Sequence, residues 1–277
     1  MSVSWPMRAA AWAVALGVSA LFLYPYAWML SGAFRSAEEM LGNPLALWPA
    51  HPGLDAFRAI AQPGGVPLWR LALNSVVLTG ASAALSVTVT ALGAYAVVRR
   101  PDAPAFRILR GGFLVVAMYP YMLLVIPVYF VMHRLGLLGS MVGIVLFLSL
   151  GPVQFFLFEQ FFRTLPTEVL EAASLDGAGE LTTLLRIVLP MARPVVATVT
   201  IITVLLNWAQ WFPVLVISTT PDTYTLPVAL LNLNGELGTQ FQSIMAMAVL
   251  ATLPPAALFL VVQRRVMGGM AEGAVKG

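Results

Sequence analysis

Residues 71–98 read LALNSVVLTGASAALSVTVTALGAYAVV. This run contains no Asp, Glu, Lys or Arg, although Arg70 precedes it and Arg99 follows it. About 20 apolar residues are enough to cross the hydrocarbon core of a bilayer, which is about 30 Å thick. A segment in lipid must satisfy its own backbone N–H and C=O groups, and a helix does so. The run therefore predicts a transmembrane helix.

Five further charge-free runs of similar length lie on either side of this one. Each is long enough to span a bilayer as a helix, so the sequence predicts an all-α polytopic membrane protein with a single transmembrane domain over residues 1–277. The first run is longer than the core of a signal peptide, about 7–15 residues, and we expect it to be retained. The six predicted transmembrane helices lie at about residues 9–34, 71–98, 111–132, 135–158, 194–217 and 240–263.

The composition agrees with a chain that is mostly dissolved in lipid. Apolar side chains make up 60% of it and charged ones only 10%, whereas soluble domains carry about 25% charged residues. The net charge of +3 is too small to indicate a nucleic-acid partner, and we expect none. The absence of cysteine excludes a disulfide framework and a thiolate nucleophile. His51 and His133 have no third ligand beside them in the sequence, so we expect no metal site.

The basic residues predict the orientation in the membrane. With the N-terminus inside, 11 of the 15 Lys and Arg residues lie in cytoplasmic segments, and the other four are Arg35, Arg58, Arg70 and Arg134. Because cytoplasmic loops carry an excess of Lys and Arg, we expect both termini in the cytoplasm.

The connection between the fourth and fifth predicted helices, residues 159–193, is long and lies on the cytoplasmic side in this orientation. A structureless loop of that length is uncommon in a compact domain. Pro166 ends the preceding helix and Thr167 can cap a new one. Gly177 can adopt the left-handed conformation that interrupts a helix, and a second short helix is expected from about Gly179 to Val188. The segment 164–190 is therefore predicted to fold as a helix, a glycine turn and a helix.

The first of these helices has one thin face. Val169, Ala172 and Ala173 are spaced to share a stripe, and the two alanine side chains are small. Another body could therefore approach the helix backbone closely at this stripe.

The same segment contains Glu171-Ala172-Ala173, then Gly177 after three residues and Ile187-Val188-Leu189-Pro190 after nine more. This extended pattern resembles the EAA signature of the permeases of binding-protein-dependent ABC importers. The resemblance implies that the segment docks on a separate ATPase. The residues implied in this coupling are Glu171, Ala172, Ala173, Asp176, Gly177 and Pro190.

Other motifs along the chain resemble the sugar-permease branch of that family, which includes the maltose/trehalose-type transporters. They include Tyr24-Pro25, Asn74-Ser75 at the expected opening of the second helix, Ile126-Pro127 and the terminal residues 273–277. One position departs from the family. Its fifth helix often carries Trp-Asn followed by a carboxylate, whereas this chain has Trp208-Ala209-Gln210, which puts in doubt a substrate contact transferred to that position.

The resemblance implies a set of partners in a bacterial-type plasma membrane. They are a second homologous permease subunit, a dimeric ABC ATPase, an extracytoplasmic solute-binding protein, membrane lipid and a carbohydrate substrate, an oligosaccharide or disaccharide. The sequence has no G-x-x-x-x-G-K-[ST] phosphate loop. We therefore expect that the chain is not an enzyme and binds no cofactor, and that ATP and Mg²⁺ bind to the partner ATPase.

Three polar residues inside predicted spans have two open interpretations. Gln154, Asn207 and Gln210 either line the substrate path or form hydrogen bonds between helices. In the second external loop, Asn232, Asn234 and Gly235 resemble the family's contact to the binding protein. Glu159, at the end of the fourth predicted helix, is either a proton carrier or a solvated boundary charge.

Two other functional classes remain as alternatives. An ion-coupled secondary carrier is disfavoured, because the six runs hold no Asp, Glu, Lys or Arg for an ion relay. A non-transporting membrane scaffold would have no use for a docking signature.

Overall fold

In a computed structural model of the chain, the structure describes residues 5–62, 65–236 and 241–274, and the side chains of 234–236 and 264–274 are not among the described groups. All regular elements in these ranges are helical. They are α1 (Trp5–Gly32), α2 (Ala37–Gly42), α3 (Asp55–Ala59), α4 (Leu68–Arg99), α5 (Pro104–Met118), α6 (Tyr121–Arg134), α7 (Met141–Leu148), α8 (Pro152–Phe162), α9 (Thr167–Leu175), α10 (Glu180–Thr183), the π-helix η2 (Leu184–Val188), α11 (Leu189–Met191), α12 (Arg193–Trp208), α13 (Phe212–Ile217), the 3-10 helix η3 (Pro221–Thr223), α14 (Leu226–Glu236) and α15 (Phe241–Ala274).

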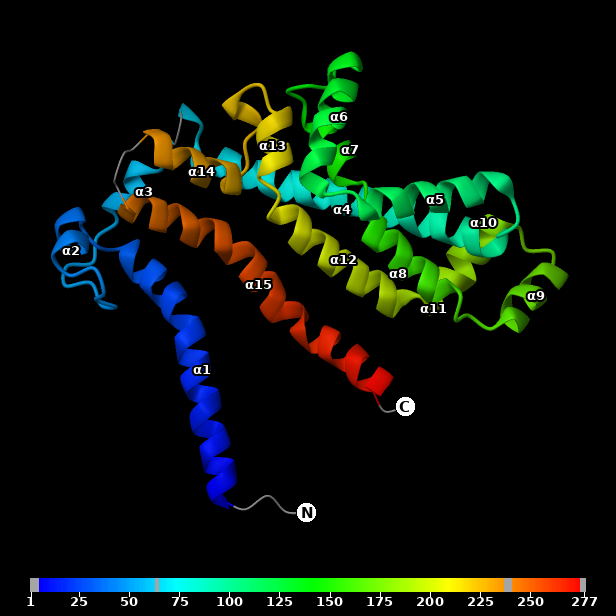
Figure 1. The fold of residues 1–277 in the computed structure, drawn as a ribbon, viewed down its shortest axis with the longest axis horizontal. Coiled ribbons are helices and arrows are strands. Elements are labelled where there is room, and N and C mark those ends of the chain that lie inside the picture. Colours follow the sequence, from blue (N-terminus) through cyan, green and yellow to red (C-terminus); the bar gives the residue numbers. More distant parts are fainter. Residues whose placement is uncertain (1–4, 63–64, 237–240, 275–277) are drawn as a thin grey trace. The chain divides into compact units, whose positions relative to one another are not determined.

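The chain divides into two compact units. The first unit consists of Met1–Arg70 and Ala229–Pro254, and the second of Leu71–Val228 and Pro255–Gly277. In the second unit α5, α8 and α12 run alongside α4, and α9 lies at one end of this group (Figure 1).

Three described helices are long and apolar enough to cross a membrane unbroken. They are α1, α4 and the part of α15 from Phe241 to Gln263. Three bent helix pairs pass the same test, so the number of spans reaches six if each pair is one span. The pairs are α5 with α6, α7 with α8, and Glu180–Met191 with α12. The prediction of an all-α polytopic membrane protein is confirmed.

Three of the predicted helices are broken in the structure, and proline accounts for each break. The expected helix 111–132 is split between α5 and α6, which meet at 119°. Tyr119 is extended, with φ −87° and ψ 136°, because the residue before a proline avoids the helical region. The expected helix 135–158 breaks before Pro152, with a bend of 44°. The expected helix 194–217 ends at Trp208 and restarts at Phe212, just before Pro213.

The core of the second unit is rich in phenylalanine. The ring of Phe155 on α8 stacks on Phe113 of α5 with centroids 4.2 Å apart. Lipid tails are as apolar as these side chains, so close packing rather than transfer from water holds such helices together. The same cluster continues into the segment after α8, where Leu170, Leu184 and Val188 are buried.

Candidate functional site

The helix α9 begins at Thr167, directly after Pro166. Pro166 occupies the N-cap position, and no side chain caps the helix. The expectation that Thr167 caps it is wrong, because Thr167 is already the first helical residue. Glu168 lies in the first turn, where the helix dipole stabilises a carboxylate.

Gly177 ends α9 as predicted. Its φ is +76°, a left-handed value that glycine adopts without a steric penalty. The N–H of Gly177 donates to the carbonyl of Ser174 at 3.1 Å, and the N–H of Ala178 donates to the carbonyl of Ala173 at 3.0 Å. These two bonds form a Schellman motif, which satisfies carbonyls that the helix end would otherwise leave free. The chain therefore turns sharply after one short helix.

Packing holds α9 by one narrow face. A helix of 9 residues is marginal in water without tertiary contacts. Here Leu170 is buried in the core cluster of the second unit, and Ala173 is also buried. Ala172 is exposed and Val169 half-buried, so the expected stripe of Val169, Ala172 and Ala173 is not a single surface. The structure turns Ala173 inward, because it lies one turn from Leu170.

The opposite face of α9 is open. Glu168, Glu171, Ala172 and Asp176 are exposed, and Leu175 is 90% exposed. A leucine this exposed, at the tip of a short helix and beside carboxylates, is a candidate contact for another protein.

The second helix of the segment is not a regular α-helix. It starts at Glu180, widens into the π-helix η2 and continues to Met191. The N–H of Leu189 donates to the carbonyl of Leu184, five residues back. Pro190 lacks an N–H, and its ring would clash with the carbonyl four residues earlier in a regular helix. The wider π turn before Pro190 avoids this clash.

Glu180 links the segment to α4. Tyr95 Oη donates to Glu180 Oε2 at 2.9 Å. Arg99 Nε donates to the same oxygen at 3.1 Å, and Arg99 Nη2 donates to Glu180 Oε1 at 3.3 Å. The carboxylate therefore receives hydrogen bonds on both oxygens, immediately after the glycine turn.

Glu159 forms a second link, just before α9. It is 3% exposed, and its Oε1 accepts bonds from Arg110 Nε of α5 at 2.7 Å and from Arg163 Nη2 at 2.6 Å. An unpaired carboxylate at this depth would cost several kcal/mol, so the two arginines are what permits its burial. The sequence left two interpretations of Glu159 open. Its burial contradicts one of them, a solvated boundary charge.

Sequence reasoning missed these two ion-pair groups. The charges were visible in the sequence as boundary residues of predicted spans. The partners, however, are separated by 81 residues for Arg99 and Glu180 and by 49 for Arg110 and Glu159, and no local signal specifies such pairs.

Two of the polar residues within the spans have partners inside the second unit. Gln154 Nε2 donates to Thr203 Oγ1 at 3.1 Å, and Asn207 Nδ2 donates to Ser82 Oγ at 2.8 Å. Gln210 is half-buried in the break between α12 and α13. Gln154 and Asn207 therefore join helices, and a role of all three in a substrate path stays a prediction.

The expected second external loop contains a helix, α14, that runs from Leu226 to Glu236. Of the expected binding-protein contacts, Asn232 is half-buried on α14. Asn234 and Gly235 lie outside the residues whose surroundings the structure describes, so this prediction stays untested.

The residues that lead into α14 are held by hydrogen bonds from Asn74 and Ser75, which were expected at the start of the second predicted helix. Asn74 lies in the second turn of α4 rather than at its opening, because α4 begins at Leu68. Asn74 Nδ2 donates to the carbonyls of Asp222 and Tyr224 at 2.8 and 2.9 Å. The N–H of Leu226 donates to Ser75 Oγ at 2.9 Å.

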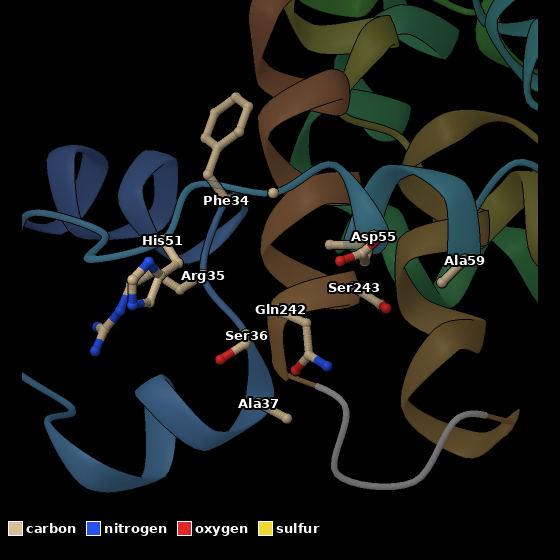
Figure 2. Close-up of a pocket in the computed structure, with 11 residues that line it drawn as sticks. Phe34, Arg35, Ser36, Ala37, His51, Asp55, Ala59, Gln242 and Ser243 are labelled. Atoms are coloured by element: carbon tan, nitrogen blue, oxygen red, sulfur yellow. The ribbon is translucent and has the colours of Figure 1, made fainter.

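The first unit contains a cavity of about 350 Å³. Figure 2 shows Arg35 and Ser36, which lie between α1 and α2, and His51 from the loop after α2 on one side of it, and Gln242 and Ser243 of α15 on another. Arg35 is 4% exposed and donates to the carbonyls of Glu39, Asn43 and Ala46 at 2.6, 2.5 and 3.1 Å. Its guanidinium is thereby committed to holding this loop in shape.

Glu39 fixes the same loop from the other side. Its Oε1 accepts N–H bonds from Ala50 at 2.7 Å and from His51 at 3.2 Å. Desolvation opposes ionisation, but these N–H bonds together with nearby Arg35 hold the pKa of the Glu39 carboxyl below its usual value. No group of three potential metal-binding side chains occurs among the residues that the structure describes.

Unbroken and proline-bent helices that are long and apolar enough to cross a membrane, with a folded segment between two of them that begins with the exposed helix α9, define a class: a polytopic membrane protein. Residues 67–271 match the family described as the binding-protein-dependent transport system inner membrane component. The chain belongs to this family, and its predicted identity as an ABC importer permease is confirmed. Members of this family are transport components rather than enzymes.

Named relatives align over nearly the whole chain. The sn-glycerol-3-phosphate transport system permease protein UgpE of Escherichia coli is 31% identical over 93% of this chain and 93% of its own length. The trehalose transport system permease protein SugB of Mycobacterium tuberculosis is 29% identical over 98% of each chain. The diacetylchitobiose uptake system permease protein NgcG of Streptomyces coelicolor is 29% identical over 93% of this chain and 85% of its own.

A solved structure shares the fold. It is a crystal structure of a bacterial ABC transporter involved in the import of the acidic polysaccharide alginate. The TM-score is 0.80, with 21% identity, over 95% of this chain and 99% of the matched one. This likeness shows the fold.

Proposed function

We propose that this chain and a second homologous permease subunit form the translocation path of an ATP-driven importer, and that segment 164–190 couples the path to a dimeric ABC ATPase. The observation that carries the proposal is the open face of α9, with Glu171 and Leu175 exposed next to a glycine turn. ATP and Mg²⁺ bind to the ATPase subunits. Their closure moves α9, and the spans alternate between access from the two sides of the membrane.

The substrate that we propose is a carbohydrate, an oligosaccharide or disaccharide. The names of the relatives support this class, since they include trehalose and diacetylchitobiose systems. The relative named for sn-glycerol-3-phosphate makes that compound a necessary comparison. An extracytoplasmic solute-binding protein delivers the substrate, with Asn232, Asn234 and Gly235 as its proposed contacts. Gln154, Asn207 and Gln210 remain the proposed polar residues of the path.

The orientation that we propose places both termini and segment 164–190 in the cytoplasm of a bacterial-type plasma membrane. The absence of cysteine allows a direct test with single-cysteine variants. Ala50→Cys, in the loop between α2 and α3, should react with a membrane-impermeant thiol reagent applied from outside. Leu175→Cys should react only after the membrane is opened, and the reverse pattern would overturn this topology.

Coupling is tested with the same two variants in the assembled transporter. Leu175→Cys should cross-link to the ATPase, whereas Ala50→Cys should not. A Leu175→Cys variant that assembles and never captures the ATPase would contradict the docking role.

Transport is tested with the reconstituted complex in proteoliposomes, with ATP on the ATPase side and the binding protein on the other. Trehalose, maltose, diacetylchitobiose and sn-glycerol-3-phosphate are compared as solutes. We expect ATP-dependent uptake of a carbohydrate that requires the binding protein. Uptake by the purified chain alone, or uptake driven by an ion gradient without ATP, would overturn the proposal.

A further inference from the structure

The stretches of chain that precede and follow α9 are each joined to one of two neighbouring helices. Before α9, Glu159 binds Arg110 of α5, and after α9, Glu180 binds Arg99 and Tyr95 of α4. The helices α4 and α5 follow each other in the chain, separated only by residues 100–103. Two carboxylates, one on α8 and one at the start of α10, therefore join the chain before and after α9 to the two arms of one helical hairpin.

We propose that Glu159 and Glu180 are positioning residues that transmit the displacement of α9 to the α4–α5 hairpin. This inference rests on the proposed function, since it assumes that an ATPase moves α9. In addition, it specifies which helices the displacement of α9 reaches. These are α4 and α5, as well as α12, which follows along the chain.

The packing of α9 is too small to carry the movement by itself. Its buried side chains are Leu170 and Ala173, one medium-sized and one small, and the chain on either side of α9 is non-helical at 163–166 and 176–179. A helix held by so little apolar surface can tilt independently of its neighbours. The ion pairs fix the two points of the chain that flank α9, because each carboxylate is bonded from two side chains and at least one of them lies on α4 or α5.

The bonds themselves have the geometry of firm links. Arg163 Nη2 and Arg110 Nε lie 2.6 and 2.7 Å from one oxygen of Glu159, and hydrogen bonds between two charged groups are shorter and stronger than neutral ones. Glu159 is buried, whereas its two arginines are half-exposed. Loss of either arginine would leave this buried carboxylate with fewer donors, which is costly, so the link resists opening.

Aromatic contacts reinforce the position of these links. The ring of Tyr95 meets that of Phe162 edge-to-face at 6.1 Å. Tyr95, which binds Glu180 from α4, thus also touches the last residue of α8, four positions before Pro166. The links before and after α9 share this packing and are expected to move as one body.

The experiment measures solute imported per ATP hydrolysed by the complete reconstituted transporter. The variants are Glu159→Gln and Glu180→Gln, which keep the side-chain volume and remove the charge. We expect each variant to keep its ATP hydrolysis within about twofold while the transport ratio falls by about fivefold or more, the range seen when coupling residues are altered. The matched control is Asp102→Asn, which removes an exposed carboxylate from the turn between α4 and α5 and should leave the ratio unchanged.

A charge exchange separates transmission from a folding defect. Arg99→Glu combined with Glu180→Arg re-creates the pair with its charges reversed, and we expect it to restore most of the ratio that either single change loses. Ratios that stay unchanged in Glu159→Gln and Glu180→Gln would overturn the inference, as would a fall in hydrolysis and uptake in equal proportion. If the wild-type complex itself shows no ATP-dependent uptake, the proposed function fails, and this inference fails with it.

Discussion

Asn207 at the end of α12 is hydrogen-bonded to Ser82 of α4, with 2.8 Å between Nδ2 and Oγ. The same nitrogen lies 3.3 Å from the carbonyl oxygen of Leu148, the last residue of α7. Helix α7 stops at Leu148, and α12 stops at Trp208, one residue after Asn207. A carbonyl at a helix end inside a membrane needs a partner from the protein. One amide therefore joins three helices at the point where two of them break.

We expect Asn207→Leu to destabilise the subunit by about 1 kcal/mol, the usual size of a hydrogen bond between membrane helices. The carbonyl of Leu148 would lose a donor, and Ser82 would lose its contact with α12. The thermal unfolding midpoint of the purified complex in detergent should fall by about 2–4 °C. The control is Gln210→Leu, since the Gln210 side chain makes no hydrogen bond within the described part of the chain. Equal midpoints for the two variants would contradict the structural role of Asn207.

Gly177 and Gly179 offer a matched pair for testing the turn after α9. A Cβ added at either position would meet nothing within 4 Å, but φ is +76° at Gly177 and −69° at Gly179. Gly177→Ala should therefore strain the turn by about 1–2 kcal/mol and reduce ATP-dependent uptake, whereas Gly179→Ala should leave it unchanged. The complex should still assemble, as judged by co-purification of the ATPase. Identical uptake by both variants would show that the left-handed turn is not needed for coupling.

A substitution at Leu175 can test docking on the ATPase without disturbing the folding of the subunit. Because the side chain is 90% exposed, Leu175→Ser should change the stability of the subunit by less than about 0.5 kcal/mol. If docking buries the leucine, the variant should weaken association with the ATPase by about tenfold or more, since burial of a leucine contributes about 1.5–3 kcal/mol. Binding to the purified ATPase is measured directly in detergent. Leu45→Ser, the same type of change at a residue that is 74% exposed in the loop between α2 and α3, should have no effect.

The stability of the loop that Glu39 holds should decrease at low pH. The pKa of Glu39 is lower in the folded protein than its usual value, so its contribution to stability is present above the unfolded-state pKa and is lost as the pH falls through the folded-state pKa. The protection factors of the Ala50 and His51 amides against hydrogen exchange should be high at neutral pH and should fall as the pH drops through the folded-state pKa of Glu39. Glu39→Gln should show low protection factors at these amides at neutral pH and little further change in them on acidification. The neighbouring variant Glu38→Gln, which alters an exposed carboxylate, should behave as the wild type.

The helical class and the turn after α9 could be read from short stretches of sequence. The run 71–98 lies inside α4 (Leu68–Arg99), because a long charge-free segment has only one way to satisfy its backbone in lipid. Gly177 has the left-handed conformation that its place after an apolar helical pattern predicted. These features depend on residues that are close together in the chain, so composition and spacing are sufficient to reveal them.

Only the tertiary structure decided where the spans bend, which side of α9 faces inward, and which charges pair. The sequence showed Pro120 and Pro152 but not whether lipid-spanning helices would continue past them. Ala172 and Ala173 are the same residue type in adjacent positions, and packing against the core buries only the second. Glu159 and Glu180 find arginines dozens of residues away, since the geometry that brings them together belongs to the packed helices and not to any local pattern of residues.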